Sequence, residues 1–150
     1  MNSIITKLNK KTRNILDEIH LERINNNKGL KRVISYLFLN KKKNIFKNKI
    51  CGDFGCGNHA GNAKSMFLQG AKFIYLVDLS KSILPQIKKI LNKHKNKFKF
   101  TKGSVEKLPF KNNFFDVINC SGVIHHTNND DKAYKEIFRV LKKGGTAFIV

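Results

Sequence analysis

The sequence predicts an α/β fold in which helices cover both faces of a doubly wound, mostly parallel sheet. Short apolar runs alternate with stretches of helical periodicity from residue 49 to residue 150, and this alternation is typical of βαβ units. A glycine-rich turn follows the first apolar run, and polar residues follow several later ones. We expect the strand order 3-2-1-4-5 of a doubly wound sheet, with right-handed crossovers between parallel strands. In such a sheet, ligands bind beyond the carboxyl ends of the strands.

The first half of this region predicts three strands and two helices. The first three elements are a strand over 49–54, a helix over about 62–69 and a strand over 72–77. The second helix is expected to begin with Ser82 as its N-cap, because Pro85 is tolerated only near a helix start. Residues 97–102 then alternate at period two, which predicts a third strand whose outward lysines suit an exposed sheet edge.

The second half predicts two further strands around one helix. The segments are a loop over 103–110, a strand over 114–120, a helix ended by 142–145, and the start of a fifth strand over 146–150. Either Asn128 or Asn129 can cap the helix, whose first turn is acidic. Its apolar stripe is expected to comprise Ala133, Ile137 and Leu141, with Tyr134 and Phe138 alongside.

Positive charge is unevenly distributed along the chain. The net charge is +20, to which residues 1–49 contribute +10 and residues 81–111 contribute +9. Lysine supplies 26 of the 30 basic side chains, whereas nucleic-acid bases are read mainly by arginine forks. We therefore expect a solvated lysine surface, with nucleic acid as an alternative partner that we do not favour.

Cysteine usage and the lengths of the apolar runs narrow the class further. Cys51, Cys56 and Cys120 are odd in number and lack paired metal-ligand spacing. We therefore expect no metal site and predict a reducing, cytoplasmic environment. No apolar run approaches the roughly 20 residues of a membrane-spanning helix, so we expect no membrane span.

The glycine-rich turn carries the strongest functional signal. Gly55 and Gly57 permit a tight turn and the close approach of a ligand. Asp78 ends the second strand, twenty-one residues beyond Gly57, where a carboxylate can accept hydrogen bonds from ribose hydroxyls. Asp53 stands just before the glycines, where its charge would repel a pyrophosphate but attract a cationic ligand. The turn therefore favours a cationic nucleoside over a dinucleotide such as NAD.

Together with three later stretches, this turn resembles the class I S-adenosylmethionine-dependent methyltransferases. The four matching stretches are the first motif at 53–57, the ribose motif at 77–80, the adenine loop and fourth strand at 103–110 and 115–118, and the block at 123–126 and 136–145. The resemblance covers residues 50–150, and the four stretches match the family in their order and spacing. It implies a Rossmann-like fold, S-adenosylmethionine as the cofactor, and methyl transfer to a substrate that is most often a small molecule.

The resemblance also implies ten cofactor-binding residues at the strand ends. The methionine end would be held by Asp53 and by the backbone of Gly55, Cys56 and Gly57. Asp78 would bind the ribose hydroxyls and Leu79 would pack on the adenine. The adenine edge would meet Ser104 and Val105, and the sulfonium side would be lined by Asn119 and Ser121.

This chain departs from the family pattern at two positions, and its catalytic groups are not identified. Ser104 stands where many relatives have an acid, and His59 stands where a third glycine is common. Methyl transfer needs a base only when the nucleophile is weakly acidic. His125 and His126 lie where a base could be, but we favour a structural or substrate-lining role for them, so we name no catalytic residue.

The chain divides at about residue 48. Residues 1–48 are expected to form a basic helical extension, and residues 49–150 the cofactor-binding domain. The resemblance implies further strands, so we expect this domain to be incomplete at its C-terminal end, with the fifth strand open to self-association. Two alternatives to a small-molecule methyltransferase remain: an RNA or protein methyltransferase that uses the basic extension, and a non-catalytic cofactor-binding module.

Overall fold

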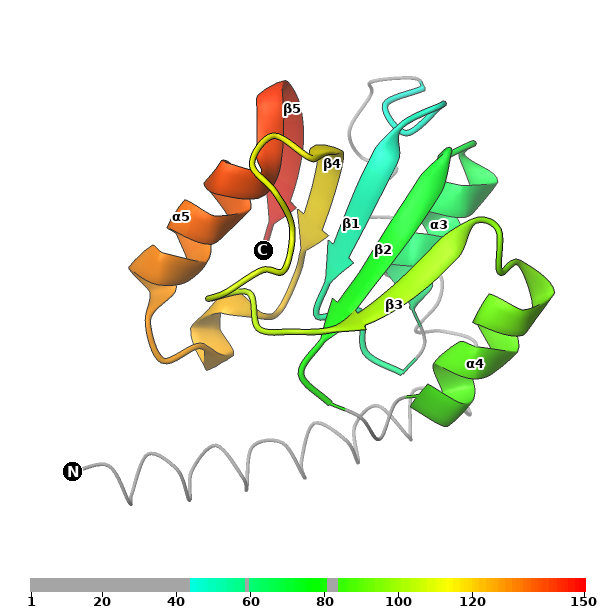
Figure 1. Ribbon diagram of the computed structural model, residues 1–150, viewed down its shortest axis with the longest axis horizontal. Coiled ribbons are helices and arrows are strands. Elements are labelled where there is room, and N and C mark those ends of the chain that lie inside the picture. The colour runs from blue at the N-terminus through cyan, green and yellow to red at the C-terminus, as the bar shows by residue number, and fades with distance from the viewer. Residues whose placement is uncertain (1–43, 59, 81–83) are drawn as a thin grey trace.

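The computed structural model describes residues 44–58, 60–80 and 84–150, and it contains the predicted sheet (Figure 1). The elements are β1 (Ile50–Phe54), α3 (Gly61–Leu68), β2 (Phe73–Asp78), α4 (Leu84–Lys93), β3 (Phe98–Lys102), β4 (Phe115–Cys120), the short 3-10 helix η1 (Ile124–His126), α5 (Asp130–Val140) and β5 (Leu141–Ile149). The strand order is β3-β2-β1-β4-β5, and these strands pair in parallel. The predicted fold class is therefore confirmed. The helices expected in residues 1–43, together with His59 and Ser82, lie outside the described residues.

The sheet is covered on both faces because its strands alternate between two apolar clusters. Ile74 and Leu76 pack with Met66 of α3 on one face. Val77, the residue after Leu76, points to the other face and packs in the cluster that contains Ile137 of α5. Two-sided burial of this kind is expected for a parallel sheet, and it leaves the polar strand ends as the place where a ligand can bind.

The junction between α5 and β5 differs from the prediction. Leu141 was expected on the apolar stripe of the helix, but α5 ends at Val140 and Leu141 pairs with Phe115 of β4. The register then shifts, so that Thr146 pairs with Val117. The extra residues form a bulge in which Gly144 has a φ of 73°, a conformation that suits glycine. The segment 142–145 thus belongs to β5 instead of ending the helix.

The outward face of α5 also differs from the prediction. Tyr134 and Phe138 were expected beside the apolar stripe, but they are 47% and 81% exposed. Ala133 and Ile137 are buried as predicted. The reason is angular: neighbours of a buried position lie about 100° away around a helix, and the stripe that contacts the sheet is narrow. Ile149 of the edge strand β5 is partly exposed. Self-association of the chain through this strand stays a prediction.

The N-cap of α5 gives a testable contribution to stability. The Asn129 side chain accepts a hydrogen bond from the Lys132 amide at 2.9 Å, whereas Asn128 is the neighbouring exposed residue. We expect Asn129→Ala to lower the free energy of unfolding by about 1 kcal/mol, the usual cost of a lost N-cap. Asn128→Ala is the matched control and should stay within about 0.5 kcal/mol of the wild type. Equal denaturant midpoints for the two variants would contradict the assignment of the cap.

Candidate functional site

The polar residues singled out in the sequence converge at the carboxyl edge of the sheet. Asp53 of β1 is in register with Asn119 of β4. On the other side, β1 pairs with β2, which ends at Asp78. The Gly103 amide donates to the Asp78 carbonyl at 3.0 Å, which brings the segment containing Ser104 to the same edge. The structure thus gathers these strand ends at one rim, which we call the carboxyl rim.

The centre of the carboxyl rim is a buried hydrogen-bonded network around Asp53. Asp53 is 0% exposed. Its Oδ1 accepts from the Asn119 side-chain amide at 2.9 Å, and its Oδ2 accepts from the Ala63 amide in the first turn of α3 at 3.1 Å. The Ser121 hydroxyl donates to Asn119 Oδ1 at 2.8 Å. One carboxylate therefore joins β1, β4 and the start of α3.

Burial makes the charge of Asp53 costly and also gives it a long reach. Burial raises the pKa of Asp53 to about 6, although the hydrogen bonds from Asn119 and from the Ala63 amide act in the opposite direction. The group is still mainly ionised at neutral pH. In a poorly solvated setting a negative charge is weakly screened, so it favours a cation at the rim. Because the Asp53 side chain is fully buried, it would attract a cationic ligand through its electrostatic field and not through direct contact with its oxygens.

The glycine-rich turn is fixed to β2 by its own backbone. The Gly55 amide donates to the Val77 carbonyl at 2.7 Å, and the Gly57 amide donates to Asp78 Oδ2 at 3.0 Å. Asp78 Oδ1 accepts from the Ser80 amide at 2.9 Å. Each carboxylate oxygen has a second lone pair, so Asp78 can still accept hydrogen bonds from a ligand. The turn is therefore preorganised around the carboxylate that the sequence assigns to ribose.

The loop between β4 and α5 packs directly over this turn, a contact that the sequence did not reveal. Gly55 has a φ of 69°, and a Cβ placed on it would lie 2.1 Å from Cγ2 of Val123. Glycine is thus needed at this position both for its backbone conformation and for the space that Val123 occupies. Two residues beyond Val123, the exposed rings of His125 and His126 lie 3.9 Å apart between centroids.

The remaining predicted residues lie around the same rim with different exposures. Leu79 is 55% exposed, so an apolar surface is available next to Asp78. Val105 is buried, and the Ser104 hydroxyl accepts from the Glu106 amide at 3.1 Å. Burial strongly raises the pKa of the Cys56 thiol, so this cysteine stays protonated and is a poor nucleophile.

The histidine pair offers basic nitrogen near the rim. Partial burial is the main cause that lowers the pKa of His126, and the proximity of His125 lowers it further. The ring is therefore mainly neutral at pH 7 and able to accept a proton.

Within the part of the chain that the structure describes, no group of three or more His, Cys, Asp or Glu side chains is arranged to hold a metal ion. No described helix is both long enough and apolar enough to cross a membrane.

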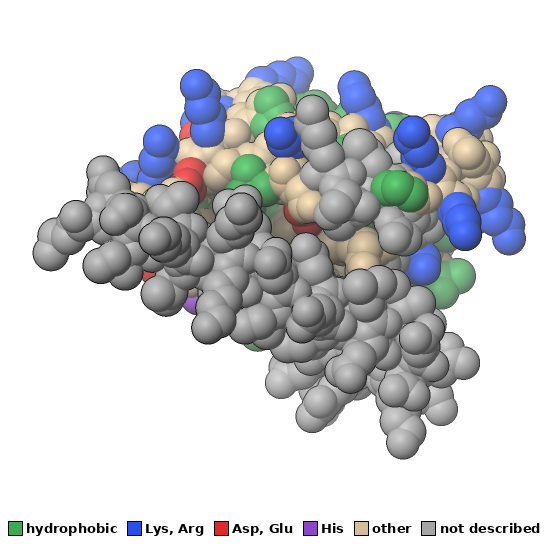
Figure 2. Space-filling model, turned by 90° about the horizontal axis from the view of Figure 1, so that it is seen from below, with side chains coloured by type: hydrophobic (Ala, Val, Ile, Leu, Met, Phe, Trp, Pro, Cys, Tyr) green, Lys and Arg blue, Asp and Glu red, His purple; other side chains and the backbone are tan. Residues whose placement is uncertain are grey.

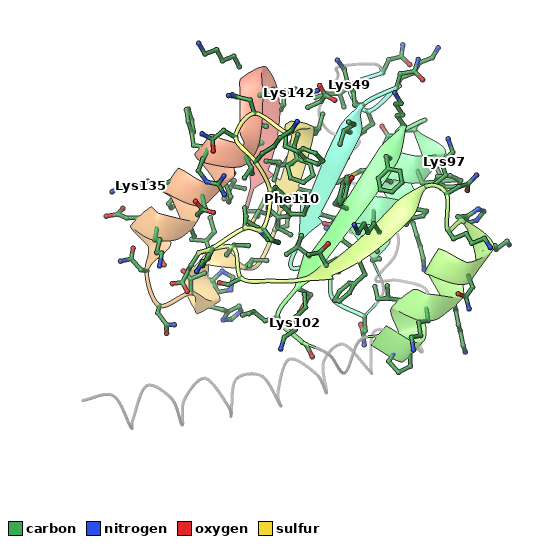
Figure 3. All side chains as sticks on the ribbon, viewed as in Figure 1. Lys49, Lys97, Lys102, Phe110, Lys135 and Lys142 are labelled. Carbon is green, nitrogen blue, oxygen red and sulfur yellow. The ribbon has the colours of Figure 1, made fainter. Side chains whose placement is uncertain are left out.

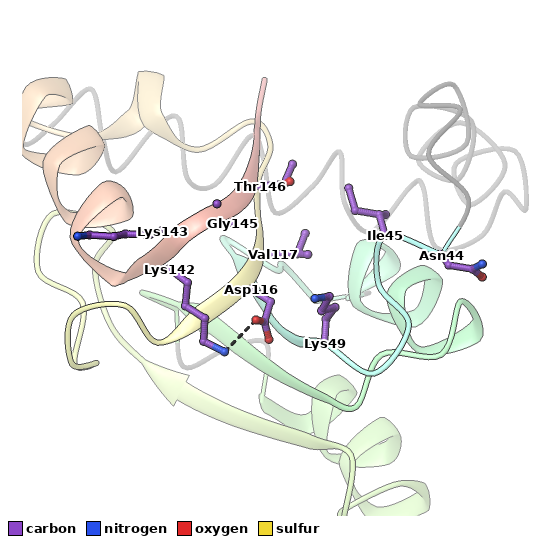
Figure 4. Close-up of a pocket in the computed structure, with 10 residues that line it drawn as sticks. Asn44, Ile45, Lys49, Asp116, Val117, Lys142, Lys143, Gly145 and Thr146 are labelled. Atoms are coloured by element: carbon purple, nitrogen blue, oxygen red, sulfur yellow. Dashed lines mark hydrogen bonds and ion pairs between the residues drawn. The ribbon is translucent and has the colours of Figure 1, made fainter.

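A separate hollow lies at the opposite, amino edge of the sheet (Figure 4). It has a volume of about 310 Å³ and is lined by residues that include Lys49, Lys142 and Lys143. Lys142 is paired with Asp116 at 2.8 Å. In Figure 3, Lys49, Lys97 and Lys142 all lie along the edge at which the strands begin. The amino edge therefore carries these lysines and Asp116, while the carboxyl rim carries the acids Asp53 and Asp78, with Lys102 at the end of β3.

Figure 2 views the molecule from below Figure 1, the side on which the strands end, and shows Lys and Arg side chains around the margins of the described part of this face. The carboxylate in the lining of the hollow, Asp116, is already paired with Lys142, whereas the carboxyl rim combines a preorganised glycine turn with two acids. We therefore take the carboxyl rim as the functional site.

Comparisons with known proteins show the family to which the chain belongs. Residues 52–149 match the methyltransferase domain family. The chain is 34% identical to a tRNA U34 carboxymethyltransferase from Campylobacter fetus over 105 residues, which cover 69% of this chain and 36% of that protein. It is 37% identical to the ubiquinone/menaquinone biosynthesis C-methyltransferase UbiE from Vibrio campbellii over 51 residues, which cover 34% of this chain and 20% of that protein. The chain thus spans about a third or less of the length of these curated relatives.

Among solved structures, a Methanococcus maripaludis protein assigned as an S-adenosyl-L-methionine-dependent methyltransferase has the same fold, with a TM-score of 0.69. The match covers 81% of this chain and 55% of that one, at 23% identity. The fold is an α/β Rossmann-like sheet. The chain belongs to the methyltransferase domain family, within the class I S-adenosylmethionine-dependent methyltransferases.

Substitution of Gly55 tests the packing of the two loops at this site. Gly122 provides a matched control, because its φ is also positive, at 70°, but nothing lies within 4 Å of the added Cβ. We expect Gly122→Ala to lower the free energy of unfolding by about 1–2 kcal/mol, the cost of the left-handed backbone. Gly55→Ala should cost clearly more, and adding Val123→Ala should recover part of the excess in a double-mutant cycle. Equal costs at the two glycines would show that Val123 does not press on the turn.

Proposed function

We propose that this chain binds S-adenosylmethionine at the carboxyl rim and transfers its methyl group to an acceptor. The observation that carries the proposal is the buried Asp53–Asn119 network directly beneath a glycine turn that is tied to Asp78. A phosphate-binding turn has no use for a buried acid at this position, whereas a ligand with an ammonium group and a sulfonium is attracted by one. Family membership supports the same cofactor.

The residues of the rim fit the two ends of this cofactor. Asp53 would act through its field and by fixing the start of α3, while the backbone of Gly55, Cys56 and Gly57 would shape the methionine end. Asp78 retains acceptor capacity for the ribose hydroxyls, and exposed Leu79 offers an apolar surface for the adenine. Ser104 and Val105 would border the adenine, and Asn119 and Ser121 the sulfonium side.

The chemistry asks little of the protein beyond binding and orientation. The bound sulfonium supplies a methyl group that a nucleophile can attack in line, with the electron pair of the broken bond remaining on sulfur. Because the leaving group is neutral, holding the acceptor in line supplies much of the rate. Neutral His126 could accept a proton from a weakly acidic acceptor, but we favour a substrate-lining role for the histidine pair.

A small molecule is the acceptor that we favour, with RNA as the second candidate. The two relatives named above act, by their names, on a transfer RNA and in quinone biosynthesis, so they do not share an acceptor. The described lysines that gather at the amino edge, including Lys49 and Lys142, lie at the opposite edge of the sheet from the carboxyl rim. Phosphate contacts there would hold an RNA away from the methyl group. All three cysteines are buried free thiols, which fits the cytoplasmic environment that we propose.

The proposed function is tested by calorimetric titration of the chain with S-adenosylmethionine and, separately, with NAD. We expect saturable binding of S-adenosylmethionine and none of NAD. Asp78→Ala should weaken S-adenosylmethionine binding by about 1–3 kcal/mol, the scale for lost hydrogen bonds to a charged group. Asp131→Ala removes an exposed acid from α5 and is the control.

Three outcomes would overturn parts of this proposal. Unchanged affinity in Asp78→Ala, with thermal melts showing that the variant is folded, would remove the ribose assignment. Tight binding of NAD would favour a dehydrogenase. Binding of S-adenosylmethionine without methyl transfer to any acceptor tested, on a chain extended to the length of its relatives, would favour a non-catalytic module.

A further inference from the structure

The loop that follows β3 has little regular structure, and so its backbone must find partners elsewhere. This loop, residues 103–112, connects β3 to the turn before β4 and contains Ser104 and Val105. Its buried side chains Val105 and Leu108 pack in the cluster beneath α5. A half-buried loop leaves main-chain carbonyl groups that are costly unless they are hydrogen-bonded. What satisfies them also fixes the shape of the loop.

One side chain of α5 provides two of these bonds. Arg139 donates through Nη1 to the Phe110 carbonyl at 2.7 Å and through Nη2 to the Leu108 carbonyl at 3.0 Å. Nη1 also donates to Oδ1 of Asn112 at 2.9 Å. The guanidinium thus contacts three residues of the loop that are separated from it by 27 to 31 positions in the sequence.

Glu136, one helical turn earlier, completes the arrangement. It accepts from Arg139 Nε at 2.6 Å and from Arg139 Nη2 at 2.7 Å, and its Oε2 also accepts from the Leu108 amide at 2.8 Å. With the three bonds to the loop, all five N–H donors of the guanidinium are used. The two side chains therefore hold both the amide and the carbonyl of Leu108. A lysine could not reproduce this planar fork.

The charges of the pair reinforce each other. The hydrogen bond from Arg139 is the largest cause that lowers the pKa of Glu136, and the same bond raises the pKa of Arg139. Both groups stay ionised at any pH near neutral, so the contact does not switch in that range. The side chain of Arg139 is 31% exposed and that of Glu136 is 19% exposed, so the pair is partly shielded from screening by salt.

The far end of the loop is tied to the site itself. The Gly103 amide donates to the carbonyl of Asp78, the residue assigned to ribose, at 3.0 Å. Glu106 accepts from the Asn129 amide at the start of α5 at 2.7 Å. The segment that includes Ser104 and Val105 is therefore held between β2 on one side and α5 on the other. Its position relative to Asp78 depends on both.

We propose that Glu136 and Arg139 are positioning residues for the nucleoside end of the carboxyl rim. They touch no ligand; they fix the backbone at 108–112 so that Ser104 and Val105 stand at the place where an adenine edge would lie. The inference rests on the proposed function for the identity of the ligand. Loss of the pair should loosen this loop selectively and weaken ligands through their adenosine part.

The first test measures the loop without any ligand. We expect Glu136→Gln and Arg139→Lys to speed amide hydrogen exchange at Leu108 and its neighbours in 104–112, while β1 and β4 keep their protection. Lys135→Ala, an exposed residue on the same helix, is the control and should leave the exchange pattern unchanged. Faster exchange throughout the sheet would indicate a general loss of stability and would overturn the positioning role.

The second test measures ligand affinity by calorimetry with S-adenosylhomocysteine and with methylthioadenosine, which lacks the amino-acid end. We expect each variant to weaken both ligands by about the same factor, on the order of tenfold, the scale for a perturbed hydrogen bond to a charged group. The double variant should be less than additive, because the two residues act as one unit.

The outcomes separate this inference from the proposed function. If the wild type binds neither ligand, the proposed function fails, and the positioning role fails with it even where exchange at Leu108 changes. If the wild type binds both but the variants bind them equally well, the positioning role alone is wrong. A loss for S-adenosylhomocysteine without a loss for methylthioadenosine would place the effect at the methionine end and would also overturn it.

Discussion

The hydrogen bond between Asn119 and Asp53 is the constraint on which the rest of the site depends. A buried carboxylate is costly unless donors surround it, and here the register of two parallel strands sets the donor opposite the acid. The second oxygen fixes the first turn of α3 through the Ala63 amide. Strand pairing, the placement of α3 and the electrostatics of the carboxyl rim therefore meet at one buried group and its partners.

From this centre the rim extends in two directions through contacts between loops. Towards β2, the glycine turn is bound to Asp78, and Asp78 is bound through its carbonyl to the loop after β3. Towards α5, Val123 packs over Gly55. The helix α5 holds the loop after β3 at two points, since Asn129 at its start donates to Glu106 and Arg139 in its last turn donates to the carbonyls of Leu108 and Phe110. A site made of loops is thus held by one helix and one buried network.

Sequence reasoning placed the strand ends correctly because their signals are local. Apolar runs and the glycines mark where each strand stops, and parallel pairing then brings Asp53, Asp78 and Asn119 to one edge. The missed features depend on contacts between distant segments. Leu141 joined β5 because Phe115 was available as a pairing partner. The spacing of Glu136 and Arg139 shows that they share a helix face, but nothing local indicates that they hold Leu108, twenty-eight or more residues away.

We propose that the cofactor binds at the carboxyl rim and not at the amino edge, where Lys49 and Lys142 lie. The most direct measurement is a two-dimensional amide NMR titration of the chain with S-adenosylmethionine. We expect the largest shifts on Gly57, Gly103 and Ser121, with Lys49 and Lys142 unaffected. Shifts confined to the hollow around Lys49 and Lys142, or an absence of shifts at saturating cofactor, would contradict it.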